Sequence, residues 1–237
     1  MAQNLLLHYK EQAFYCIKAR EPLMEQVLTH GADILRSPGF QSERNYMQHG
    51  VTNCYTHSIC VAYVALRWAQ LLNLNIDVRS TVRGCLLHDY FLYDWHDNAS
   101  WHRMHGFTHG LTAALNAVRD YRDDMNPVIV DSLIKHMFPL TASRPLFTEG
   151  WLISIADKVC ASRETFTRKR FGSSKDEWLA NHAKMIAMLP VVPSEAKPVA
   201  ERIADGELDG HVVRLNAYKA LAYCRDLKHE LKTELTA

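Results

Sequence analysis

The segment TVRGCLLHDYFL, residues 81–92, decides the fold, because it is apolar enough for a protein interior yet ends in an imidazole and a carboxylate. These two groups are His88 and Asp89. A buried carboxylate without a partner is strongly unfavourable, so proteins pair such a group with a cation or coordinate it to a metal. The sequence therefore predicts that groups from elsewhere in the chain converge on Asp89.

Four further residues are suitable partners, each in its own apolar or amphipathic segment: His57, His109, His136 and Asp157. Together with His88 and Asp89 they provide imidazole and carboxylate donors but no thiolate, a mixture that suits Fe, Mn, Zn, Co or Ni. Six donors exceed what one tetrahedral ion needs but suit two ions bridged by a carboxylate, and Asp89 is the natural bridge. Two other interpretations stay open: His57 as an ordinary core histidine, and Asp157 as part of a structural salt bridge.

The composition describes an ordinary globular protein with 237 residues, 48% hydrophobic and 22% charged. The net charge of +1 gives no general electrostatic reason to bind nucleic acid or a membrane surface. No apolar run reaches the roughly 18–20 residues that span a bilayer. The six cysteines are scattered without a CxxC pair, which favours reduced thiols and a cytoplasmic location.

Hydrophobic periodicity predicts an all-α protein. Helices are expected within the following ranges: 4–36, 56–71, 78–92, 109–122, 127–136, from 151 through Asp157, 174–189, and 208 to the C-terminus. Thr56, Thr108 and Asn126 are the expected N-caps of three of them. Residues 41–53 are aperiodic and predict a loop, in which His49 either reaches the site or is an ordinary loop histidine. We expect one domain over residues 1–237, with its core at about 45–165 and helical extensions at both ends; the linker-like segment 190–198 is too short to divide it.

The loop 94–108 is rich in His, Trp and Asp, and it connects the His-Asp pair with His109. It is therefore placed to form the lip of a pocket, unless it is a surface loop with incidental histidines. Arg163 and the basic residues 168–170 are either a solvated face or a surface that steers an anionic substrate.

In their order along the chain, the six donors resemble the motifs of the HD-domain superfamily. His57, His88-Asp89 and Asp157 reproduce its H…HD…D pattern, and the added His109 and His136 resemble its dinuclear branch, H…HD…H…H…D. The flanking sequences HGFTH, HMFPL and ADK are similar to those of a bacterial group of HD proteins. The resemblance covers about residues 45–165, and it implies a helical bundle that acts as a metal-dependent phosphohydrolase.

The resemblance also implies a role for each donor. His57, His88, Asp89 and Asp157 would hold one metal, while His109 and His136 would hold a second that shares Asp89. His88 and Asp89 would thus lie at the catalytic centre. Many HD hydrolases carry a lysine soon after the HD pair, where this chain has Tyr90-Phe-Leu-Tyr. The phosphate contacts are therefore expected from four substitutes, Arg103, His102, Lys158 and Arg163.

The expected reaction is hydrolysis of a phosphoester or phosphoanhydride in a nucleotide-like small molecule. The expected cofactors are two divalent transition-metal ions, and the expected partner is the phosphorylated substrate alone, with neither nucleic acid nor membrane. Two alternatives remain: an HD-type di-iron oxygenase, and a non-catalytic metal-binding regulatory module.

Overall fold

Helices form most of the described part of the chain, as the periodicity predicts. The computed structural model describes residues 21–50, 52–97 and 102–167. Several predicted segments lie outside these ranges: the helices expected at 4–20, 174–189 and 208–237, the linker-like segment 190–198, and the basic residues 168–170. The helices are α2 (Glu21–Arg36), α3 (Pro38–Ser42), α4 (Cys54–Leu71), α5 (Val78–Leu87), α6 (His105–Tyr121), α7 (Pro127–Lys135) and α8 (Thr148–Thr167). Two short 3₁₀ turns, η2 (Glu43–Asn45) and η4 (Arg122–Asp124), complete the helical elements described. None of the described helices is long and apolar enough to cross a membrane.

One small β-hairpin interrupts this helical pattern in the range that the sequence predicts as a loop. Strand β1 (Met47–His49) pairs antiparallel with β2 (Thr52–Asn53), and His49 lies opposite Thr52. Gly50 in the turn has φ +62°, a left-handed conformation that glycine adopts without strain. Strands of three and two residues are too short to give the alternation of apolar and polar residues by which a strand is predicted from sequence.

Side-chain caps explain where several helices begin. Asn126 caps α7 by accepting a hydrogen bond from the Ile129 backbone N–H, as predicted. Helix α4 is capped by Asn53, which accepts from the Thr56 N–H, so the prediction of Thr56 as the cap was wrong. Thr108 does not cap α6 either, because that helix already begins at His105.

Helix α5 ends at Leu87, and His88 and Asp89 therefore lie in the turn that follows it. The prediction of a helix as far as Leu92 was wrong. The Tyr90 N–H donates to the Leu87 carbonyl, the Phe91 N–H donates to that of Asp89, and Leu92 has a positive φ of 61°. These tight turns direct the chain away from the helix axis immediately after the His-Asp pair.

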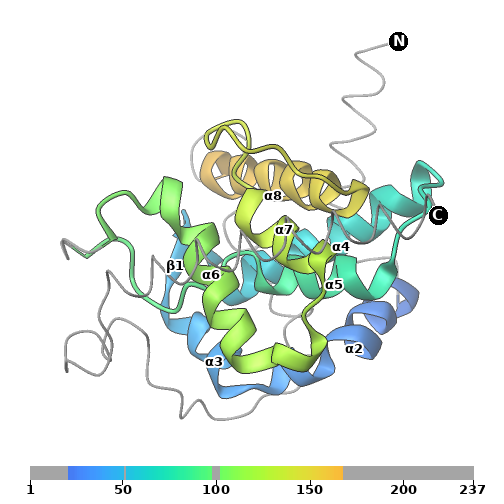
Figure 1. Cartoon of the computed structure of the whole chain (residues 1–237), viewed down its shortest axis with the longest axis horizontal. Helices are drawn as coiled ribbons and strands as arrows, with labels where there is room; N and C mark the ends of the chain where they lie inside the picture. Colours follow the sequence, from blue (N-terminus) through green and yellow to red (C-terminus); the bar gives the residue numbers. More distant parts are fainter. Residues whose placement is uncertain (1–20, 51, 98–101, 168–237) are drawn as a thin grey trace, which may run out of the picture.

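The helices pack around α4, which contacts both α5 and α8 (Figure 1). Helix α7 packs against α5, α6 and α8, and α2 covers α5. The shared core is apolar, with fully buried residues that include Ile59, Ala62, Leu86, Leu133 and Ile153. This arrangement brings the ends of α5 and α7 and the middle of α8 toward one another.

Helix α8 is buried on one face only. Leu152, Ile153 and Ala156 belong to the core, whereas Trp151, Ile155 and Val159 are 38–49% exposed. Residues 151–160 are apolar almost all round in the sequence, which predicts a helix buried on every side, so that prediction was wrong. Asp157 nevertheless lies on the inner face and is only 6% exposed.

Candidate metal centre

Four histidines turn the same ring nitrogen toward one point, because the opposite nitrogen of each is held by an acceptor. The Nδ1–H of His88 donates to the Cys85 carbonyl, that of His136 to the Leu133 carbonyl, and that of His109 to the His105 carbonyl, each at 2.8 Å. His57 donates its Nδ1–H to the carboxylate of Glu164, also at 2.8 Å. The Nε2 atoms are thus left with lone pairs, which is the orientation a metal-binding histidine requires.

The first donor set consists of His57 Nε2, His88 Nε2, Asp157 Oδ1 and Asp89 Oδ2. His57 Nε2 lies 3.2 Å from Asp157 Oδ1 and 3.6 Å from Asp89 Oδ2. His88 Nε2 lies 3.3 Å from Asp89 Oδ2 and 3.7 Å from Asp157 Oδ1. Ligands bonded at about 2.1 Å to one ion are about 3.0–3.4 Å apart at right or tetrahedral angles. The four atoms are therefore close to the spacing that a single cation needs.

The second donor set consists of His109 Nε2, His136 Nε2 and Asp89 Oδ1. Asp89 Oδ1 lies 3.3 Å from His109 Nε2 and 3.8 Å from His136 Nε2. The two Nε2 atoms are 2.8 Å apart. The carboxylate of Asp89 thus divides its oxygens between the two donor sets, as a bridging ligand does.

The donors fit a metal because, without a cation, several of these contacts are unfavourable. His109 and His136 both donate from Nδ1 to carbonyls, so in the neutral rings their Nε2 lone pairs face each other. His88 Nε2 and Asp89 Oδ1 are buried and have no hydrogen-bond partner among the described residues. A buried polar atom without a partner costs free energy, which a bound cation would remove.

The charges of the centre shift the pKa values of its members in opposite directions. Burial lowers the pKa of His88, but the carboxylates of Asp89 and Asp157 outweigh it and raise that pKa to about 9. Burial raises the pKa of Asp89, but the adjacent imidazoles of His88 and His109 hold it well below its usual range. For His136, burial together with the charges of His109 and His88 lowers the pKa to about 3. In metal-free protein, a proton on His88 therefore offsets part of the negative charge of Asp89 and Asp157.

A pocket of about 900 Å³ opens onto these donors. Among the predicted substrate-binding residues, Arg103, His102 and Lys158 line it, together with Trp95 of the same loop; Arg163 is not among the described lining residues. Arg103 is exposed, and His102 is held by a 2.6 Å contact of its Nε2 with Asp97. Lys158 donates to the main-chain oxygens of His136 and Ser154 and to the Ser154 hydroxyl. Trp101 lies outside the described residues.

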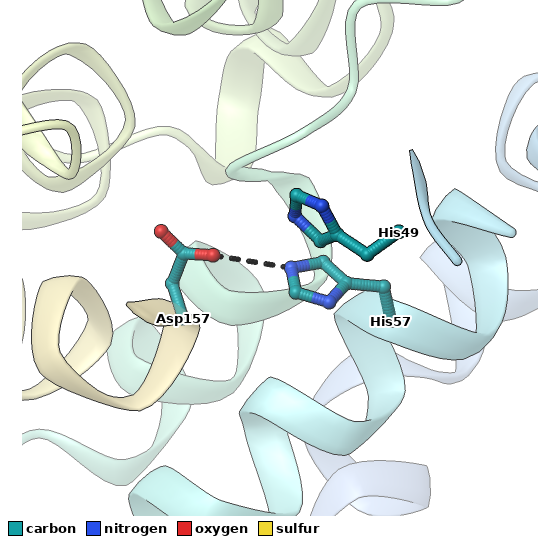
Figure 2. Close-up of side chains that lie close together, drawn as sticks. All are labelled: His49, His57 and Asp157. Atoms are coloured by element: carbon teal, nitrogen blue, oxygen red, sulfur yellow. Dashed lines mark hydrogen bonds and ion pairs between the residues drawn. The ribbon is translucent and has the colours of Figure 1, made fainter. Parts of the chain in front are cut away.

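The sequence left the role of His49 open and did not identify two further residues near these donors, Gln48 and Glu164. One donor atom from each of His49, His57 and Asp157 lies within 4.8 Å of the others (Figure 2). Gln48 donates to Asp89 Oδ2 at 2.5 Å. Glu164 follows Asp157 by seven residues on α8, which is two helical turns, and this spacing could have placed both on one face. The positions of Gln48 and His49 have no comparable signal.

Comparison with known proteins supports the interpretation of the motifs. Residues 54–162 match the family model of the HD domain, and this range includes all six predicted donors. Searches of curated proteins and of solved structures gave no match. The predominantly helical fold, the ordered H…HD…H…H…D residues and this match together show that residues 54–162 form an HD domain.

Proposed function

We propose that this protein is a metal-dependent phosphohydrolase that cleaves a phosphoester or phosphoanhydride bond of a small, nucleotide-like molecule. The division of Asp89 between the two donor sets carries the proposal. His57, His88, Asp89 and Asp157 would hold one cation, and His109, His136 and Asp89 a second. When bound, such a pair would supply Lewis acidity toward a phosphoryl group and an activated water. Both donor sets are drawn from imidazoles and carboxylates, so the ions are expected among Fe, Mn, Zn, Co and Ni.

The chain's own residues then orient the substrate. Asp89 and His88 lie at the centre of the proposed reaction, and Asp89 contacts both donor sets. Arg103 is exposed on the pocket wall and can move to contact phosphate oxygens. Lys158 has three acceptors already, so we expect it to contribute its charge rather than a direct hydrogen bond.

The shape of the pocket supports a substrate larger than inorganic phosphate. Its volume of about 900 Å³ falls within the roughly 300–1,000 Å³ that is typical of small-molecule sites. Met104, Phe107 and Leu140 line it and are 47–55% exposed, so they present an apolar wall to an incoming ring. A nucleobase or a similar planar group stacks favourably on such a wall.

Metal analysis followed by a hydrolysis panel tests the proposal. The protein would be reconstituted without oxygen, its metal content measured, and phosphate release followed from nucleotides and simple phosphoesters with Mn, Fe, Co, Ni or Mg. We expect redox-inert ions to support turnover. A reaction that requires iron and oxygen together would instead establish the oxygenase alternative, and a metal-loaded protein inert toward the whole panel would favour a regulatory module.

A further inference from the structure

We infer that His49 is an additional protein ligand, and that it binds the same cation as His57 and Asp157. The inference rests on the metal centre proposed above and extends it beyond the HD motif, because position 49 precedes the matched residues 54–162. One donor atom each from His49, His57 and Asp157 lies within 4.8 Å of the other two. Figure 2 shows both imidazole rings on the same side of the Asp157 carboxylate.

His49 approaches the centre from the pocket side. It lines the pocket together with Asp89 and Asp157, whereas His57 and His88 are fully buried and are not among the lining residues. Neither ring nitrogen of His49 has a hydrogen-bond partner in the described part of the chain. The His49 ring does pack against the His57 ring, with 5.2 Å between the two centroids.

The residues on either side of His49 fix its position. Gln48 is anchored to Asp89 by its side-chain amide. A Cβ on Gly50 would lie 2.6 Å from the main-chain oxygen of Glu164, so the hairpin rests directly on α8 at the residue whose carboxylate holds His57. One hairpin therefore connects the bridging carboxylate with the support of the first donor set. Such anchoring on both sides is what holds a ligand in a productive geometry.

A purely structural role is the competing explanation, because the His49 ring packs edge-on against His57. The variant His49→Phe separates metal binding from packing, since it keeps an aromatic ring but has no ring nitrogen. His49→Ala removes both the ring and the donor. His96→Ala is the control, because His96 is an exposed histidine that belongs to neither donor set and is not among the described residues that line the pocket.

The experiment is a titration of metal-free protein with Co²⁺, followed by visible absorption and by equilibrium competition with a chelator. We expect both His49→Ala and His49→Phe to bind Co²⁺ at least about tenfold more weakly than wild type, with a changed absorption band. His96→Ala should keep the wild-type affinity and band. Thermal unfolding of each metal-free variant confirms that it is folded.

The outcomes separate this inference from the proposed function. If His49→Phe keeps the wild-type affinity and band, His49 is a packing residue and the inference is overturned, although metal-dependent hydrolysis can still hold. If the wild-type protein binds no Co²⁺, both are overturned. If His49→Phe binds Co²⁺ weakly, and the wild-type protein releases phosphate without needing iron and oxygen, the results support both this inference and the proposed function.

Discussion

Asp89 is the residue on which both donor sets depend, so its charge can be tested without changing its size. Asp89→Asn keeps the volume but removes the negative charge between the sets. We expect a loss of at least about 10³-fold in kcat/KM, which corresponds to about 4 kcal/mol, together with lower metal content. Asp77→Asn is the control, because Asp77 caps the other end of α5 and asparagine caps equally well. Near-wild-type turnover in Asp89→Asn would remove Asp89 from the mechanism.

Glu43 offers a test of buried charge outside the donor sets. It is fully buried, and neither carboxyl oxygen has a hydrogen-bond partner in the described part of the chain. Burial, reinforced by the Asp89 charge and only partly offset by His57, raises the pKa of Glu43 well above its ordinary value of 4.5. The folded protein therefore keeps a proton that the unfolded chain releases as the pH rises above about 4.5. Above that pH, the free energy of unfolding falls by up to about 1.4 kcal/mol per pH unit until the pH reaches the folded-state pKa.

Glu43→Gln should remove this pH-dependent loss, because glutamine does not titrate. In metal-free protein, we expect the Tm of the variant to exceed that of wild type by an amount that grows from pH 5 to pH 8. Thermal unfolding at three pH values in the presence of a chelator measures it. A difference in Tm that is constant with pH, or that shrinks as the pH rises, would contradict a raised pKa for Glu43.

Among the elements, α6 and α7 pack closely enough to bring His109 and His136 together. A Cβ on Gly110 would lie 2.6 Å from the Leu133 main-chain oxygen and 3.2 Å from His136 Cε1. Gly110→Ala should therefore push the helices apart and disturb the second donor set while leaving the first intact. We expect bound metal to fall from about two ions per chain to about one, and overpacking to cost roughly 1–3 kcal/mol of stability.

Gly106→Ala is the matched control on the same helix. Its added Cβ would meet only Leu140 Cδ2 at 3.3 Å, and that residue is half exposed and can move. The control should keep both ions and gain helix propensity. Elemental analysis measures the metal content of both variants. Equal metal content in Gly110→Ala and Gly106→Ala would show that the contact of α6 with α7 does not position the second donor set.

The loop between α5 and α6 provides the pocket wall on which Arg103 lies. If Arg103 contacts an anionic substrate, Arg103→Ala should raise KM by about tenfold and lower kcat much less. Arg144→Ala removes the same charge from an exposed position outside the described lining and should leave both constants unchanged. Steady-state kinetics at two ionic strengths measures both, and an effect on kcat alone would place Arg103 in the chemical step instead.

At the scale of the whole molecule, the donors come from α4, from α6, from α8 and from the turns after α5 and α7, so the unfolded chain cannot present them together. A metal that binds only the folded protein adds about 2.7 kcal/mol at a free concentration 100 times its Kd. For a chain of this length that corresponds to a Tm increase of roughly 5–10 °C. Calorimetry with rising metal concentration tests this, with Asp89→Asn expected to show a much smaller increase and a chelator expected to reverse it.

The sequence predicted the helical fold and the six converging donors because both depend on local pattern. Each donor lies on, or directly after, a periodic apolar segment, and packing of those segments brings the donors together. The ends of α5 and α6 and the exposed face of α8 were missed because turn geometry and tertiary cover decide them. His49 could not be assigned, since its position depends on the contact of Gly50 with Glu164, residues 114 apart in the chain.

The partners of the four Nδ1 atoms are not alike: three are main-chain carbonyls, and one is the carboxylate of Glu164. A carboxylate makes the imidazole it supports a stronger electron donor than a carbonyl does. The two cation positions should consequently differ in affinity and, with iron, in reduction potential. The protein would then fill in a fixed order, with the position beside His57 occupied first, and it could hold two different metals or two oxidation states at once.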